Sequence, residues 1–336
     1  ARSDIFDDVT FDQVLRQARR DATPQDGRTR IIEHLRATQT KGRAAIAAAF
    51  RANPFQSRPT TRAYCWLTDQ IVKTVLDICH TRLHPLATPT EGERLAVIAV
   101  GGYGRGEMAP FSDVDLLFLT PYKITPWAES LIESALYMMW DLKLKVGHAS
   151  RTIKDCLRLG REDYTIRTSL VEFRFLTGDA DLAETLRKRL WTDLFRSTAA
   201  EFVEAKLAER AARHTKQGGQ RYVVEPNVKE GKGGLRDLQS MYWIAKYVNG
   251  VRTTEELVGR GVFTPEEFAT FVNAEDFLWA IRCHLHMIAN RAMDQLTFDM
   301  QVQVAERMGY TDHDGRRARS EEHTSELQSH SEISYA

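Results

Sequence analysis

The sequence predicts an α+β protein, with an α/β core built on a mixed sheet and all-helical segments flanking it. Two observations predict this class. Short apolar runs that suit buried strands lie at Leu95–Val100 and Val114–Leu119, and glycines separate them. Longer stretches before and after these runs repeat apolar residues at helical spacing among charged residues.

The segment before the core is predicted to be helical, with helices at about residues 28–50 and 60–83. The second helix places its apolar residues on one face: Tyr64, Leu67, Ile71, Val75 and Ile78. It is expected to end ahead of Pro85, because proline lacks the backbone donor that a helix needs.

Within the core, Gly101 and Gly102 end the first strand, and a helix is expected to start near residues 104–108. After the second strand we expect a helix at about residues 126–142 and a strand at about 144–151. The chain then reads as helical from about residue 153 to 212 and again from about 235 to 310, with a polar, glycine-rich interval between.

Composition indicates an ordinary globular protein of 336 residues, with 43% hydrophobic and 27% charged residues. No apolar run approaches the roughly 20 residues that span a bilayer, and the first twenty residues are highly charged. We therefore expect a cytoplasmic protein without membrane contact. The four cysteines are scattered without a CxxC pair, which indicates reduced thiols with packing roles rather than disulfides or a zinc site.

The last residues, 319–336, resemble the translation of a sequencing-library adapter, and we expect them to be a disordered artefact. Removing their one arginine and four glutamates from totals of 46 and 46 leaves 45 basic and 42 acidic residues. This mildly basic balance suits a polyphosphate substrate and gives no reason to expect nucleic acid.

The segment VGGYGRGEMAPFSDVDLLFL, at residues 100–119, carries the chemistry. Glycines after a strand let the backbone bend and let its N–H groups approach a phosphate, and Arg105 can add a charged donor. Asp113 and Asp115 are two residues apart, so on a strand they project to one face. Because two close carboxylates repel each other, they indicate a shared Mg²⁺ that also meets substrate phosphates. Ser112 could bind a phosphate or orient Asp113.

This segment resembles the signature of the DNA-polymerase-β-like nucleotidyltransferases, and in detail that of the [protein-PII] uridylyltransferase/uridylyl-removing enzymes. The resemblance continues through WDLKLKVGHASRT (140–152), SLVEFRFLTGD (169–179) and EPNVKEGKGGLRDLQ (225–239). We therefore expect four segments: a helical extension (1–90), a nucleotidyltransferase core (91–180), a helical domain (181–318) and the adapter-like artefact (319–336).

The resemblance implies that Asp113 and Asp115 coordinate the metals and that Gly101, Gly102 and Arg105 face the phosphates of UTP. It implies transfer of a uridylyl group to a tyrosine hydroxyl of the PII signalling protein, with pyrophosphate leaving. Full-length family members also carry an HD phosphohydrolase domain and two glutamine-sensing ACT domains. We expect neither function here, because His313 lies in a charged loop without the other residues of an HD set.

Several residues are left with two readings. The superfamily usually supplies a third carboxylate, for which Glu172 ranks slightly ahead of Asp141; the alternative is a salt bridge from Glu172 to Arg174 or Arg151. His148 is either a nucleotide contact or a structural histidine. In KEGKGGLRD, Lys232 and its neighbours either bind phosphate or form a connecting turn. His284 and His286 are two apart on a predicted helix and are not expected to bind metal.

Two other functions stay open on the sequence alone. The chain could be a nucleotidyltransferase for another acceptor or nucleotide, such as an adenylyltransferase. It could also be an inactive fragment that binds PII or nucleotide without turnover.

Overall fold

The computed structural model describes residues 5, 6, 13, 16, 17, 24–88, 90–217, 223–251 and 253–311. The adapter-like residues 319–336 and the His313 segment lie outside these. The chain forms two compact units. Unit 1 comprises residues 1–49, 60–108 and 112–189, and unit 2 comprises residues 50–59, 109–111 and 190–336. The four predicted segments are continuous in sequence, whereas the two units are defined by contacts between residues. The four segments stay predictions.

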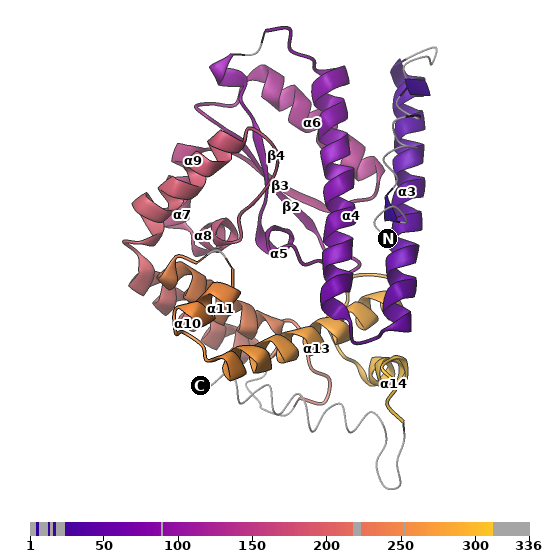
Figure 1. Ribbon diagram of the computed structural model, residues 1–336, viewed down its shortest axis with the longest axis vertical. Coiled ribbons are helices and arrows are strands. Elements are labelled where there is room, and N and C mark those ends of the chain that lie inside the picture. Colours follow the sequence, from indigo (N-terminus) through magenta and orange to yellow (C-terminus); the bar gives the residue numbers. More distant parts are fainter. Residues whose placement is uncertain are drawn as a thin grey trace. The chain divides into compact units, whose positions relative to one another are not determined.

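The elements up to the end of the sheet are, in chain order (Figure 1), α3 (Pro24–Ala52), α4 (Ser57–Ile78), η1 (Cys79–Leu83), η2 (Glu91–Glu93), β1 (Ala96–Ala99), α5 (Gly101–Gly104), β2 (Val114–Thr120), α6 (Pro126–Asp141), β3 (Val146–Thr152), α7 (Ile153–Glu162), α8 (Tyr164–Val171) and β4 (Arg174–Gly178). They are followed by α9 (Ala180–Leu190), η3 (Trp191–Phe195), α10 (Ala199–Lys216), α11 (Leu235–Asn249), α12 (Glu255–Gly259), α13 (Pro265–Ala289) and α14 (Phe298–Arg307).

The sheet of unit 1 has the strand order β3-β2-β1-β4. β1 runs antiparallel to both β2 and β4, whereas β2 and β3 are parallel. All four residues of β1 are buried, as expected of a central strand between covered faces. This mixed sheet with its flanking helices confirms the predicted α+β class.

The two helices before the sheet form as the apolar spacing predicts. Figure 1 shows α3 and α4 side by side, and their closeness has a local cause at Gly42: a Cβ on that residue would lie 3.0 Å from Cδ2 of Leu67. The one-sided apolar pattern of α4 is buried, and the π-helical turn η1 carries the helix on to Leu83, just before Pro85.

Two local predictions were wrong. The stretch from 153 to 212 is not continuously helical, because β4 interrupts it between α8 and α9. This short strand is held by pairing with β1, and tertiary pairing overrides a weak local signal. The helix after the first strand begins at Gly101 rather than near Gly104, because the glycine bend itself forms the helical turn α5.

Unit 2 is built on helices α10, α11, α13 and α14. Its core joins α13 and α14 to the start of the 50–59 segment, with Phe50, Ile281, Leu285, Leu296 and Val304 each at most 1% exposed. His284 and His286 are both buried in this unit: His284 contacts the Pro54 carbonyl at 3.1 Å, and His286 accepts from the Phe111 N–H at 3.2 Å. These contacts give both imidazole rings a structural role.

The described part of the chain contains no helix that combines the length and the apolar character needed to cross a membrane. All four cysteines are buried free thiols, which agrees with the packing role predicted for them.

Candidate active site

The turn after β1 depends on a glycine backbone. Val100 is still extended (φ −129°, ψ 172°), and Gly101 then takes φ +60°, a conformation that glycine adopts without the cost other residues meet. The helical turn is closed by two backbone bonds, from the Gly104 N–H to the Val100 carbonyl (3.0 Å) and from the Arg105 N–H to the Gly101 carbonyl (3.2 Å). The first N–H groups of such a turn have no acceptor within it.

The Asp115 carboxylate lies directly beside this turn. A Cβ built on Gly101 would be 3.0 Å from Oδ2 of Asp115, and one built on Gly147 would be 2.7 Å from Oδ1. The backbone is tied to the same place, because the Val100 N–H donates to the Asp115 carbonyl at 3.1 Å. The predicted closeness of acid and glycine bend therefore holds for Asp115, and two glycines leave the space that its carboxylate occupies.

Asp113 is exposed and lies immediately before β2, one pleat repeat ahead of Asp115. Val114 between them is 1% exposed, which fits alternation of buried and open side chains along the chain. Ser112, next to Asp113, is half-buried.

The donor chemistry of this pair fits Mg²⁺, which takes one or two carboxylates and completes its shell with water and substrate phosphates. Within the described residues, no three His, Cys, Asp or Glu side chains gather into a metal-binding group.

Arg105 lies against the glycine turn but is engaged by acids. Its side chain is 9% exposed, its Nη1 is 3.4 Å from Oε2 of Glu172, and its Nε is 3.5 Å from Oε2 of Glu107. A Cβ on Gly102 would lie 3.5 Å from Nη2 of Arg105. Phosphate binding by Arg105 remains a prediction, and a phosphate would have to share the guanidinium with these carboxylates.

Glu172 is fully buried and follows α8 as its C-cap, and its side chain contacts Arg105. The salt bridge predicted from Glu172 to Arg174 or Arg151 is therefore corrected, because Glu172 pairs instead with Arg105, the arginine of the glycine turn. The two elements also touch through their backbones: a Cβ on Gly104 would overlap the Glu172 carbonyl oxygen at 1.7 Å. Glu172 thus contacts the glycine turn, which itself lies beside the Asp115 carboxylate.

Two other candidates lie elsewhere in unit 1. Asp141 ends α6 and forms a surface ion pair with Arg28 at 2.7 Å. His148 of β3 pairs with Leu116 of β2, one position beyond the pair formed by Gly147 and Asp115. Because neighbouring strand residues point to opposite faces, His148 lies on the face away from the Asp115 carboxylate.

Lys232 belongs to unit 2, in a turn that precedes α11. This turn is closely hydrogen-bonded: the Asn227 side chain accepts from the N–H groups of Lys229 and Glu230, at 3.1 and 2.7 Å. The Gly233 N–H donates to the buried Asp237 at 2.8 Å. A well-ordered turn suits either reading of this motif, and the phosphate role of Lys232 stays a prediction.

Gly147 is the site residue that sequence reasoning missed. A glycine within a strand often marks the close approach of another group, and this signal was present in KVGHAS. The approaching group is the Asp115 carboxylate.

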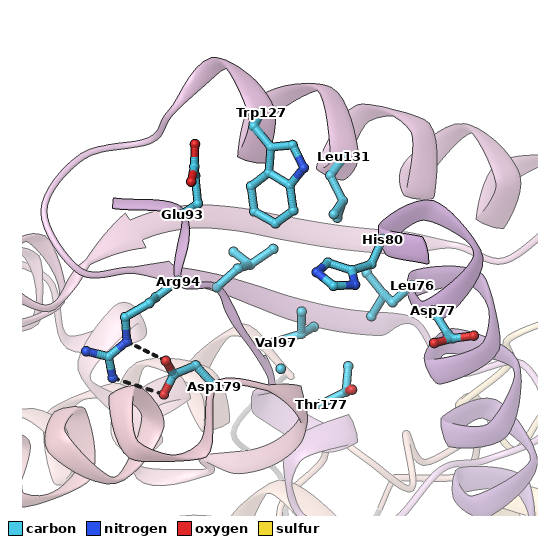
Figure 2. Close-up of a pocket in the computed structure, with 12 residues that line it drawn as sticks. Leu76, Asp77, His80, Glu93, Arg94, Val97, Trp127, Leu131, Thr177 and Asp179 are labelled. Atoms are coloured by element: carbon cyan, nitrogen blue, oxygen red, sulfur yellow. Dashed lines mark hydrogen bonds and ion pairs between the residues drawn. The ribbon is translucent and has the colours of Figure 1, made fainter. Parts of the chain in front are cut away.

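A cavity of about 340 Å³ opens elsewhere in unit 1, between η1, β1, α6 and the end of β4 (Figure 2). In the view, Trp127 and Leu131 line one side, and Arg94 is joined to Asp179 at another. Val97 of β1 lines its floor and pairs with Phe118, which is three residues from Asp115 on one continuous strand. Residues three apart on a strand point to opposite faces, so this cavity is not on the carboxylate face.

Comparison with known proteins identifies the relatives of this chain. It is 66% identical over 287 residues to a bifunctional uridylyltransferase/uridylyl-removing enzyme of Ruegeria pomeroyi, covering 85% of this chain and 32% of that protein. The enzymes of the same name from Cereibacter sphaeroides and Azospirillum brasilense are 62% and 49% identical, over 88% and 86% of this chain and 32% and 31% of theirs. The chain thus spans about a third of the length of these relatives.

Two family models match separate parts of the sequence. The model described as GlnD PII-uridylyltransferase matches residues 201–333. The model described as glutamate-ammonia ligase adenylyltransferase matches residues 8–144, which include the glycine turn and the Asp pair. Together with the high identity over most of the chain, these matches show that the chain belongs to the family of the bifunctional uridylyltransferase/uridylyl-removing enzymes.

Proposed function

We propose that this chain carries the site that transfers a uridylyl group from UTP to a tyrosine of the PII protein. The observation that supports it most is the Asp115 carboxylate, held between Gly101 and Gly147 with Asp113 one pleat repeat away. Family membership supports the nucleotide and the acceptor, because the relatives are named uridylyltransferases. With UTP as donor and the PII protein as acceptor, we propose that the reaction takes place in the cytoplasm.

In the proposed reaction, the tyrosine oxygen attacks the α-phosphorus of UTP. The bond from that phosphorus to the bridging oxygen breaks, pyrophosphate leaves, and the hydroxyl proton passes to solvent water. Bound Mg²⁺ would neutralise charge that develops on the phosphates. The N–H groups of Gly101 and Gly102 position the phosphates, with Arg105 and Ser112 as further donors.

Asp113 and Asp115 hold the cation in this proposal. Glu172 was one of two candidates, with Asp141, for the carboxylate that helps to deprotonate the hydroxyl. In this proposal its contact with Arg105 favours a positioning role.

The test is transfer of label from UTP to purified PII protein in the presence of Mg²⁺. We expect label on a PII tyrosine with the wild-type chain, and a loss of at least about a hundredfold with Asp113→Asn or Asp115→Asn. Both replacements keep the side-chain shape, and the circular dichroism spectrum should not change. Full transfer by either variant would exclude the metal role of that residue.

The adenylyltransferase match at residues 8–144 favours a second candidate, in which the nucleotide is ATP. Parallel assays with labelled UTP and ATP separate the two, and we expect UTP to be preferred because the overall identity is to uridylyltransferases. Because the chain spans only about a third of its relatives, a third outcome is nucleotide or PII binding without transfer. That outcome would identify an inactive binding fragment.

A further inference from the structure

A half-buried arginine from the edge strand β4 contacts the glycine turn. Arg174, the first residue of β4, donates from Nη2 to the main-chain carbonyl of Tyr103 at 3.0 Å. Tyr103 lies in the middle of α5, and the same carbonyl accepts from the Gly106 N–H at 3.2 Å. The Arg174 guanidinium also lies over the Tyr103 ring, 5.2 Å from its centroid. One side chain thus contacts both the backbone and the ring of the turn.

A second residue orients this arginine. Asp69 of α4 accepts two parallel hydrogen bonds from Arg174, at 2.7 Å from Nη1 and 3.0 Å from Nη2. Such a fork fixes the plane of a guanidinium as well as its position. Cys65, one turn earlier on α4, accepts from Nη2 at 3.2 Å. Asp69 and Cys65 of α4 therefore hold the guanidinium in place, and its Nη2 also donates to the turn.

The environment keeps this group charged and in place. Tyr103 is 1% exposed and Asp69 is 9% exposed. Burial is the largest single influence and acts to lower the pKa of Arg174, but the hydrogen bonds to Asp69 and the charge interactions with Cys65, Asp69 and Tyr103 together outweigh it and the pKa is raised. Burial and the nearby Asp69 raise the pKa of Tyr103, so its ring stays neutral.

Arg174 cannot act on the nucleotide directly from this position. It pairs with Ala99 of β1, and Ala99 pairs in turn with Leu116 of β2. Paired residues on neighbouring strands share a face, and Leu116 follows Asp115 directly, so Arg174 lies on the face opposite the Asp115 carboxylate. Its only route to the site is through the turn.

We propose that Arg174, oriented by Asp69, is a positioning residue that fixes the Gly101–Arg105 turn in the geometry that receives the triphosphate of the nucleotide. This inference rests on the proposed function for its ligand, but the anchoring of the turn can be tested without any nucleotide. Lysine cannot replace Arg174, because a single ammonium group has no planar fork to join Asp69 to the Tyr103 carbonyl.

The experiment compares the full chain with Arg174→Lys and Asp69→Asn. The control is Arg158→Lys, which makes the same change in an exposed ion pair with Glu162 on α7. Hydrogen–deuterium exchange is followed for peptides that cover the turn and, as an internal reference, α6. We expect about tenfold faster exchange at residues 101–106 in both test variants, with α6 unchanged. The control should match the wild type in both regions.

The second readout is the Kd for UTP with Mg²⁺, which we expect to rise about tenfold in Arg174→Lys and Asp69→Asn, because small misplacements of binding groups are costly. Unchanged exchange of the turn in a folded Arg174→Lys would overturn the inference whatever UTP does. Unchanged affinity beside faster exchange would also overturn it, because the anchoring would then be structural only. If the wild type fails to bind UTP, the proposed function fails, while the exchange data still decide whether Arg174 anchors the turn. If Arg174→Lys does not fold, Asp69→Asn gives the same two readouts.

Discussion

Asp115 occupies a space that two glycines keep open, one on the turn and one on the neighbouring strand. Its carboxylate lies within van der Waals reach of the positions where Gly101 and Gly147 would carry a Cβ. The two glycines differ in what they tolerate. Gly101 needs glycine for its positive φ as well as for space, whereas Gly147 has an ordinary strand backbone. Gly147 therefore isolates the effect of space alone.

We expect Gly147→Ala to lower uridylyl transfer about a hundredfold, because the new methyl group would lie 2.7 Å from Oδ1 of Asp115 and force it to move. Transfer from labelled UTP is the measurement. The matched control is Gly259→Ala, where the added Cβ meets nothing within 4 Å. Wild-type transfer by Gly147→Ala would show that Asp115 does not act from this position.

The cysteines give a prediction that is independent of the proposed reaction. Burial raises the pKa of each of the four thiols to about 12. At pH 8 only about one thiol in ten thousand would then be a thiolate, which is the reactive form. We expect iodoacetamide to leave the native chain unmodified over an hour at pH 8 and to modify four sites in guanidinium chloride, as read by mass spectrometry. Rapid labelling of the native chain would contradict the burial.

Contacts in the site could be predicted when the two residues are close in sequence, and not when they are far apart. Asp115 and Gly101 flank one short connection, so strand periodicity was enough to place them together. The ion pair between Arg105 and Glu172 joins residues 67 apart in sequence, and no local pattern specifies which arginine a buried acid will meet. The same holds for Arg174 and Asp69, which are 105 apart.

At the scale of elements, strong periodicity gave correct helices and weak signals did not. The one-sided pattern of α4 and the proline-initiated α6 were predicted to within a few residues. β4 was missed because its five residues gain their stability from pairing with β1 rather than from their own composition. That strand supplies Arg174, so the anchoring of the turn could not be foreseen either.

α13 carries a buried histidine whose titration should affect stability. The ring of His284 stacks near Phe50, with centroids 4.5 Å apart, and its Nε2 contacts the Pro54 carbonyl at 3.1 Å. Burial lowers the pKa of His284 from 6.5 to about 4, partly opposed by this hydrogen bond. The unfolded chain therefore takes up this proton more readily than the folded chain does.

The direction in which stability changes with pH follows from that difference in pKa. The contribution of neutral His284 is complete above pH 6.5 and is lost as the pH falls from 6.5 to 4, by about 3 kcal/mol of the free energy of unfolding. Urea unfolding of the wild type and of His284→Phe at several pH values measures it. We expect a shallower fall for the variant over this range, and parallel pH curves for the two proteins would refute the assignment.

At the scale of the molecule, the sheet order could be predicted only in part. Two apolar runs and the α/β pattern after them predicted three strands, but the order β3-β2-β1-β4 depends on pairing between segments far apart in sequence. Family resemblance supplied what physical patterns could not: the nucleotide and the acceptor protein. Those two remain the parts of the proposed function that rest on the relatives rather than on geometry.

Stability of the whole chain can report whether the Asp pair binds a cation, because a ligand that binds the folded state raises Tm. With Mg²⁺ and UTP at about a hundred times Kd, we expect a gain near 3 kcal/mol and a rise of several degrees. Without Mg²⁺, the carboxylates of Asp113 and Asp115 would repel the triphosphate, and UTP should raise Tm much less.

Asp115→Asn should change the Tm shift caused by UTP in opposite directions with and without Mg²⁺. Removing a negative charge should strengthen UTP binding when EDTA is present, and removing a metal ligand should weaken it when Mg²⁺ is present. The Tm shifts of wild type and variant should therefore cross between the two conditions. A residue that only supports the fold would lower both shifts together, and Glu162→Gln, a neutralised acid on the surface of α7, should change neither. Absence of the crossing would remove the cation from the proposed site and leave Asp115 as a structural neighbour of the glycine turn.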